Sequence, residues 1–153
     1  MSLPRCGIVV SILVTLFLIG CGPPDDPLIV PGKRVGDVVP GDTRMSKVVG
    51  PSGYVMPPFD ERGVTFLADG QDGTKVGTIT VSTVHYRTKE GLGVGDTSVS
   101  VRSAYGAPEV LTVSPMAVKD RPGIFASRAL HYPGIRWLVD EDGVVRFVQV
   151  MKE

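Results

Sequence analysis

The thiol of Cys21 is a reactive group at a sharp change in the composition of the sequence. An uncharged, mainly apolar run, residues 8–19, precedes it, and a lone basic residue, Arg5, stands before that run. The chain then changes abruptly to Gly-Pro-Pro-Asp-Asp. A membrane-spanning helix needs about 20 apolar residues, so the run is too short to cross a bilayer. A plain secretory signal fits the length but usually ends in small residues of the Ala-x-Ala kind, which leaves a cysteine at the boundary unexplained.

Residues 18–21, Leu-Ile-Gly-Cys, resemble the lipobox of bacterial lipoproteins. The resemblance implies that the Cys21 thiol is joined to a lipid and that the chain is cut between Gly20 and Cys21, where the small glycine admits the cleaving enzyme. Residues 1–20 are then a signal peptide. Each buried methylene contributes about 0.8 kcal/mol, so two or more acyl chains hold a protein stably at a membrane.

Lipidation has consequences for the rest of the chain. Cys6 leaves with the signal peptide and Cys21 is blocked, so the exported part must fold without a disulfide. By the same resemblance, Gly22 after the lipidated cysteine favours the outer membrane, on its periplasmic side, if the organism has two membranes. Residues 21–34 are rich in proline and predict a semi-extended tether.

The overall charge excludes one class of partner. The chain has 16 basic and 16 acidic residues and no basic run, so nucleic-acid binding has no electrostatic support. Glycine and proline are abundant, 19 and 13, and valine and threonine dominate the patterned stretches. This composition favours short strands and many turns.

Catalytic and metal-binding patterns are weak. His85 and His131 are the only histidines, they are far apart in sequence, and no serine stands in a Gly-x-Ser-x-Gly elbow. A metal site would want more histidine or cysteine ligands than the mature chain offers. We therefore expect no enzyme activity, no cofactor and no metal centre.

Two kinds of glycine-containing motif resemble ligand-binding loops, but each is explained more simply as a structural element. Residues 91–97 (GLGVGDT) precede a predicted helix yet lack the Gly-Lys-Ser/Thr of a phosphate-binding loop. The acidic stretches that begin at Asp69 and Asp140 lack the glycine and glutamate that an EF-hand loop needs. A tight hairpin turn explains them without an ion, and weak calcium binding is the alternative.

The sequence contains an imperfect internal repeat. Residues 63–69 (GVTFLAD) match residues 134–140 (GIRWLVD), and each copy is followed by Asp-Gly and a second apolar stretch. Upstream, residues 41–43 and 95–97 are both Gly-Asp-Thr. The alignment needs a two-residue gap in the first half and an insertion around residues 109–128 in the second. The repeat predicts two equivalent units, residues 35–87 and 88–153.

Each unit predicts a short helix followed by an antiparallel hairpin. In the second unit, Asp96 or Thr97 caps a helix that ends at Tyr105, and Gly106 suits a left-handed C-terminal position. In the first unit, Met45, Val48 and Val49 stand at matching places. In both units the hairpin lies against its helix, so the predicted fold is α+β, with two repeated two-layer units. On the other face of the sheet, we expect polar side chains open to a partner, namely Arg136, Thr65 and Gln149.

The second half also carries a family resemblance. The residues that carry it are Gly93 to Gly95, Val101, Tyr-Gly-Ala-Pro at 105–108, residues 132–137 and residues 140–145. They resemble bacterial envelope lipoproteins with tandem helix-plus-hairpin repeats, and are similar to β-lactamase-inhibitory-protein-like and SmpA/OmlA-type lipoprotein domains. The resemblance implies binding or scaffolding rather than catalysis. The first half departs from it, because Gly50 lacks a preceding aromatic residue.

These observations lead to three functional expectations. The first is a lipid-anchored, non-enzymatic envelope protein that binds another protein. The second is a small-ligand or cell-wall-binding module with a groove between the units, and the third is an envelope hydrolase that uses His85 or His131. Exposed aromatic side chains anchor protein interfaces, whereas Trp137 fits the buried face of a strand. The expected interface residues are Tyr54, Phe59, Tyr86, Tyr132 and Arg136.

Overall fold

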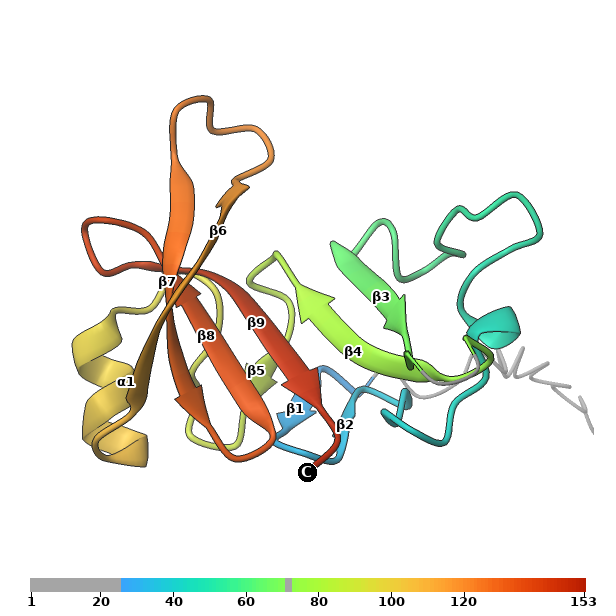
Figure 1. The fold of residues 1–153 in the computed structure, drawn as a ribbon, viewed down its shortest axis with the longest axis horizontal. Coiled ribbons are helices and arrows are strands. Elements are labelled where there is room, and N and C mark those ends of the chain that lie inside the picture. Colours follow the sequence, from blue (N-terminus) through green and yellow to red (C-terminus); the bar gives the residue numbers. More distant parts are fainter. Residues whose placement is uncertain (1–25, 71–72) are drawn as a thin grey trace, which may run out of the picture.

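Two β-sheets make up most of the computed structural model, which describes residues 26–70 and 73–153 (Figure 1). The larger sheet has the strand order β3-β4-β9-β8-β7-β6 and is antiparallel throughout, and the smaller has the order β2-β1-β5. The elements in chain order are β1 (Leu28–Val30), β2 (Arg34–Val35), the 3₁₀ turn η1 (Met45–Lys47), β3 (Val64–Ala68), β4 (Val76–Val81), β5 (Arg87–Thr88), α1 (Ser98–Tyr105), β6 (Glu109–Ala117), β7 (Phe125–Tyr132), β8 (Ile135–Val139) and β9 (Val145–Met151).

The two copies of the repeat form equivalent hairpins in one sheet. The first copy contains β3 and is followed by β4, and the second contains β8 and is followed by β9. β4 pairs with β9, with Thr80 opposite Gln149, so the hairpins join edge to edge. The interior position of β9 explains why this strand is apolar on both faces except at Arg146 and Gln149. In the β8–β9 turn, the Gly143 N–H donates to the Asp140 carbonyl, so the chain turns at the predicted Asp-Gly pair. Only Gly143 has a positive φ, +78°, and Asp142 does not.

Helix α1 forms where the sequence predicts it. The Thr97 hydroxyl accepts a hydrogen bond from the Ser100 N–H at 3.2 Å, and the helix ends at Gly106, whose φ is +84°. Val101 is fully buried beneath the helix. Ala104, three residues further along the helix, is exposed.

The predicted α+β fold with two helix-on-sheet units is wrong. The structure is mostly β, and within the described residues the first unit has only the 3₁₀ turn η1 where a helix was predicted. Its backbone is used differently: the Met45 N–H donates to the Thr74 carbonyl, and the Val76 N–H donates to the Thr43 carbonyl. The Thr43 hydroxyl accepts from the Val39 N–H, so it does not cap a helix. Pairing with the start of β4 therefore replaces the helix.

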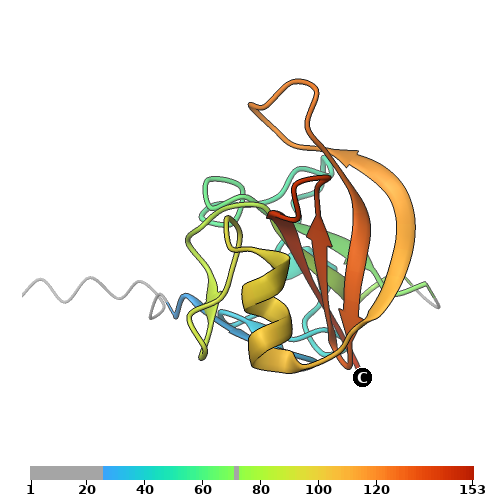
Figure 2. The same cartoon turned by 90° about the vertical axis from the view of Figure 1, so that its left-hand side faces the viewer.

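The predicted insertion also changes the architecture. Residues 109–128 form β6 and the first half of β7, which add two strands to the sheet and a projecting hairpin. The register of this pair shifts between Thr112 and Met116, and the hairpin bends there over the sheet (Figure 2). Pro115 lies in this outermost strand, where a missing N–H costs no pairing inside the sheet.

The segment predicted as a tether, residues 21–34, continues into the fold. Ile29 and Val35 are 1% and 2% exposed, and β1 pairs with β2 and with β5. The predicted boundary between the two units, after residue 87, falls inside β5. The small sheet is fixed to the large one where the Gly32 N–H donates to the Gly134 carbonyl at 3.0 Å.

The core consists of two clusters on opposite faces of the large sheet. The larger lies between that sheet, α1 and the small sheet, and includes Ile29, Val101, Ile135 and Trp137. The smaller lies beneath the bent hairpin on the other face. We call this other face, which looks towards the viewer in Figure 1, the open face. Side chains alternate between the two faces along each strand, so the core on one side leaves the intervening residues for the open face.

Candidate functional site

The predicted lipidation and cleavage residues, Cys21 and Gly20, lie outside the described residues. The structure therefore gives no geometry for them. It does fix the chain from residue 26 onward, because the Leu28 N–H donates to the Asp26 carboxylate and the Arg87 N–H donates to the Pro27 carbonyl at 3.0 Å.

Two of the predicted interface residues lie in the loop before β3. Tyr54 is 56% exposed. Phe59 is half-buried and its ring packs at right angles to that of Phe66, with 5.2 Å between the centroids. Tyr54 is therefore available to a partner, whereas much of Phe59 is used in packing.

Two other predicted interface residues belong to the core. Tyr86 is 2% exposed and Tyr132 is 7% exposed. The Tyr132 hydroxyl donates to the Gly106 carbonyl at 2.9 Å, and its ring lies beside that of Tyr105 at the end of α1. These tyrosines position α1 and β5, so we leave them out of the candidate interface.

The Tyr105 hydroxyl donates to the Glu90 carboxylate at 2.8 Å. Burial, with this carboxylate nearby, raises the pKa of Tyr105 to about 12. Tyr105 also packs against Trp137, whose indole N–H is buried without a hydrogen-bond partner among the described residues. This aromatic cluster therefore has a structural role on the core side of the sheet.

Arg136, the fifth predicted residue, lies on the open face in a line of polar side chains that crosses all six strands. The strand register places each member directly opposite the next, from β3 to β6. We call this line the polar row; its members are Thr65, Thr80, Gln149, Arg136, His131 and Glu109. The three polar residues that the sequence predicts on this face all belong to it.

Hydrogen bonds within the polar row hold its centre in place. The Arg136 Nε–H donates to His131 Nδ1 at 3.2 Å, and the Gln149 amide donates to the Thr80 hydroxyl at 3.4 Å. The side chains of Arg136 and Gln149 are half-exposed, and Glu109 is exposed. The row thus presents amide, guanidinium and carboxylate groups on a rigid support.

Sequence reasoning missed three members of the row, Thr80, His131 and Glu109. Period-two alternation assigns a residue to a face, but only the register of neighbouring strands shows which residues are adjacent. The pairing of β4 with β9 and the existence of β6 were both needed to connect the six positions.

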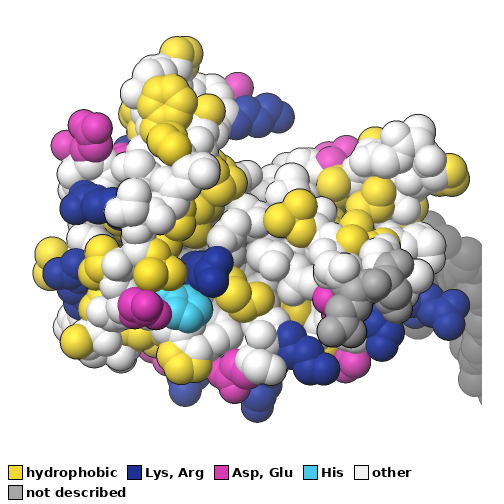
Figure 3. Space-filling model, viewed as in Figure 1, with side chains coloured by type: hydrophobic (Ala, Val, Ile, Leu, Met, Phe, Trp, Pro, Cys, Tyr) yellow, Lys and Arg dark blue, Asp and Glu magenta, His cyan; other side chains and the backbone are white. Residues whose placement is uncertain are grey.

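A line of apolar side chains runs beside the polar row on the same face, two residues further along each of four strands. Its members face one another across β9, β8, β7 and β6, and they are Phe147, Leu138, Ala129 and Leu111. The bent hairpin adds Val113, Met116 and Val118 to the same cluster. Figure 3 shows apolar side chains gathered at the foot of the projecting hairpin. The hairpin therefore covers the apolar line, in which Phe147, Leu138 and Ala129 are 7%, 2% and 0% exposed, and leaves the polar row beside it.

A cleft of about 220 Å³ lies between the hairpin tip and the loop before β3. Phe147 lines it together with residues of both predicted units, and charged side chains surround it. The lining residues are Asp60, Glu61, Gly63, Ser82, Thr83, Val118, Lys119, Asp120 and Phe147.

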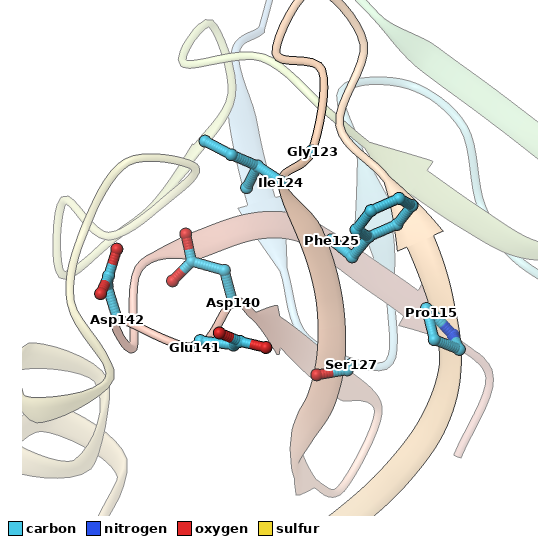
Figure 4. A pocket seen from close by; sticks show the side chains of 8 residues that line it. All are labelled: Pro115, Gly123, Ile124, Phe125, Ser127, Asp140, Glu141 and Asp142. Carbon is cyan, nitrogen blue, oxygen red and sulfur yellow. The ribbon is translucent and has the colours of Figure 1, made fainter.

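A second pocket, of about 320 Å³, lies between the hairpin and the β8–β9 turn (Figure 4). Pro115, Ile124 and Phe125 form its apolar wall. Glu141 and Asp142 stand opposite, both exposed. Figure 4 shows their carboxylates on the turn, apart from the apolar wall.

Asp140 differs from its acidic neighbours because it is only 3% exposed. Its carboxylate accepts from the Arg146 Nε–H at 2.7 Å and from the Val144 N–H at 2.9 Å. Burial alone would raise the pKa of Asp140, but these bonds and the guanidinium charge hold the pKa below its ordinary value. Asp140 is therefore a structural anion that closes the β8–β9 turn.

The two histidines lie on different elements. His85 is exposed in the loop between β4 and β5, with its ring against Tyr86. His131 belongs to β7 and the polar row. Within residues 26–70 and 73–153, no group of three or more His, Cys, Asp or Glu side chains could hold a metal ion.

A search for membrane-crossing helices among the described residues finds none of sufficient length and apolar character. Comparison of the chain with protein-family models, with curated protein sequences and with solved structures gives no match.

Proposed function

We propose that this chain is a lipid-anchored protein of the cell envelope that binds another protein through its open face. The observation that carries the proposal is the polar row, in which Thr65 and Glu109 are exposed and Arg136 and Gln149 are half-exposed. Protein interfaces carry polar groups at the rim, and here several such groups are held in line by the strands of one sheet. Tyr54 supplies an exposed aromatic side chain on the same molecule.

The chemistry of the row favours binding over catalysis. His131 Nδ1 accepts a hydrogen bond from a guanidinium, and this contact orients Arg136 rather than freeing the imidazole to abstract a proton. Arg136 keeps further N–H groups that can donate to a carboxylate or a backbone carbonyl of a partner. We therefore propose no enzymatic role.

The proposed localisation of the protein rests on the first 21 residues. The basic start, the short apolar run and the Leu-Ile-Gly-Cys sequence support lipidation of Cys21. The anchor then supplies the membrane attachment, and the outer membrane is the proposed site in an organism with two membranes.

The cleft beside Phe147 supports an alternative function, binding of a small ligand or a cell-wall fragment between the two units. Its volume of about 220 Å³ is below the range of about 300–1,000 Å³ that small-molecule sites usually have, so we favour a protein partner. Thermal-shift measurements against muropeptides, lipids and metal ions test the alternative. A rise in melting temperature that Phe147→Ala abolishes would favour it.

Site-specific photocrosslinking in cells tests the proposed interface. We expect a photoreactive residue at Thr65 or Glu109, both exposed on the open face, to give a discrete adduct with one protein. Arg136→Glu should reduce the yield of that adduct about tenfold, because it reverses the charge at the centre of the polar row. Arg102→Glu, exposed on α1, is the matched control and should leave the adduct unchanged. Equal adducts from both variants would contradict the proposed interface.

The anchor is tested separately by Cys21→Ala. This change should abolish incorporation of a labelled fatty acid and either release the protein or leave the uncut precursor. A labelled, membrane-bound product from the variant would overturn the lipidation proposal without touching the interface.

A further inference from the structure

The distance between the proposed anchor and the folded part is short. β1 begins at Leu28, and the structure fixes the chain two residues earlier, because Asp26 is bonded to Arg34 and to the Leu28 N–H. The α-carbon of Asp26 is five residues from that of Cys21. Five fully extended residues span at most about 18 Å, whatever conformation they adopt.

The chain enters the fold on the side away from the open face. Figure 2 shows β1 and β5 on the left and the strands of the large sheet on the right, and Asp26 lies beside β1, since its carboxylate accepts from the Leu28 N–H. Gly36 marks the same place, since a Cβ built on it would lie 3.2 Å from the Asp26 carbonyl. Asp26 and the polar row are therefore at opposite sides of the molecule.

The size of the fold turns this arrangement into a constraint. A domain of roughly 130 residues has a radius of gyration of about 14 Å and a diameter of about 36 Å. To bring the open face against the anchoring bilayer, the chain would have to pass around the domain, a path of more than about 40 Å. The available reach is less than half of that.

We infer that the surface around Asp26, formed by β1, β2 and β5, faces the lipid headgroups of the anchoring bilayer, and that the open face points away from them. The inference rests on the proposed lipidation of Cys21. It deepens the proposed function, because the partner must then approach from the aqueous side of the domain.

The ionisable groups of this surface support an orientation of the domain that is determined by the anchor rather than by electrostatic attraction to the bilayer. Three pairs are formed, Arg34 with Asp26, Arg87 with Asp96 at 2.8 Å, and Lys89 with Glu90 at 3.6 Å. The exposed Lys33 and Asp37 add one charge of each sign. Balanced pairs of this kind give little attraction to anionic headgroups. The short reach of the chain alone orients the domain.

Single-cysteine labelling of the lipidated protein in vesicles tests the inference. The mature chain would have no free thiol, so a dye attached to Asp37→Cys reports the β2 side and one attached to Thr65→Cys reports the open face. Both positions are exposed and polar in the native chain. With a nitroxide quencher on the lipid headgroups, we expect several-fold stronger quenching at position 37 than at position 65.

A longer reach provides the matched control. An insertion of 30 Gly and Ser residues after residue 24 adds an average reach of about 30 Å and should remove most of the difference. Equal quenching at both positions in the vesicle-bound native-length protein would overturn the orientation while leaving lipidation intact. Failure of the protein to acquire lipid would overturn both, and fatty-acid labelling identifies that case.

Discussion

Asp140 is the residue whose charge contributes most clearly to the fold. The side chains of Asp140 and Arg146 are 5% and 12% exposed, so each charge depends on the other for compensation. Removal of one partner of a buried pair costs about 3–5 kcal/mol. We expect Asp140→Asn to lie near the lower end of that range, because asparagine can still accept from the Val144 N–H. Urea unfolding at pH 7 measures the change.

The effect of Asp140 also has a predicted pH dependence. Its pKa is lower in the folded than in the unfolded protein, so its contribution is complete above the unfolded pKa of about 3.8 and is lost as the pH falls through the folded value. The stability difference between the native protein and Asp140→Asn should therefore shrink below pH 4. Asp142→Asn, an exposed neighbour in the same turn, should change stability by less than about 0.5 kcal/mol. A difference that stays constant down to pH 2 would contradict this account.

Individual side chains show how far the sequence could predict the candidate site. Trp137 was expected in the core and is fully buried, since its place in an alternating strand determines its face. Tyr86 follows His85 before a polar stretch, and Tyr132 follows His131 at the end of β7, so neither stands in a pattern that predicted its face. Their burial depends on α1 and β5, which pack against them only in the assembled fold.

At the scale of elements, the β6–β7 hairpin should be stabilised mainly by its inward-facing side chains. Met116 is half-buried against the smaller core cluster, whereas Val110 on the same strand is 53% exposed. We expect Met116→Ala to lower the free energy of unfolding by about 1–2 kcal/mol, less than for a fully buried methionine. Val110→Ala is the matched control and should cost less than about 0.5 kcal/mol. Equal losses in urea unfolding would show that the hairpin does not depend on this packing.

The elements also differ in how well local signals specify them. Helix α1 was predictable because Thr97 and Gly106 are local capping signals. The first unit contains a similar Gly-Asp-Thr sequence, but there the Thr43 carbonyl accepts from Val76, more than 30 residues away. No local pattern reveals such a bond, and the polar row depends in the same way on the long-range pairing of β4 with β9.

At the scale of the whole molecule, the division between the two sheets separates the proposed attachment site from the proposed binding face. The small sheet receives the chain from the proposed anchor, and the large sheet carries the open face on the opposite side (Figure 2). The arrangement requires that the small sheet stay fixed to the large one, because release of residues 26–35 would lengthen the reach of the anchor. The contact between Gly32 and Gly134 is one place where this attachment can be tested.

Gly134→Ala should weaken the attachment strongly. A Cβ at this position would lie 2.3 Å from the Gly32 α-carbon, a backbone atom that cannot rotate aside, and φ is +71°. The strain of a positive φ alone costs about 1–2 kcal/mol, so we expect a loss of more than about 3 kcal/mol in urea unfolding. Gly123→Ala is the matched control, because its φ is +83° and a Cβ there meets nothing within 4 Å. Amide hydrogen exchange in residues 28–35 should be faster for Gly134→Ala alone. Equal exchange rates and equal losses of stability in the two variants would mean that backbone strain, not the contact between sheets, causes the destabilisation.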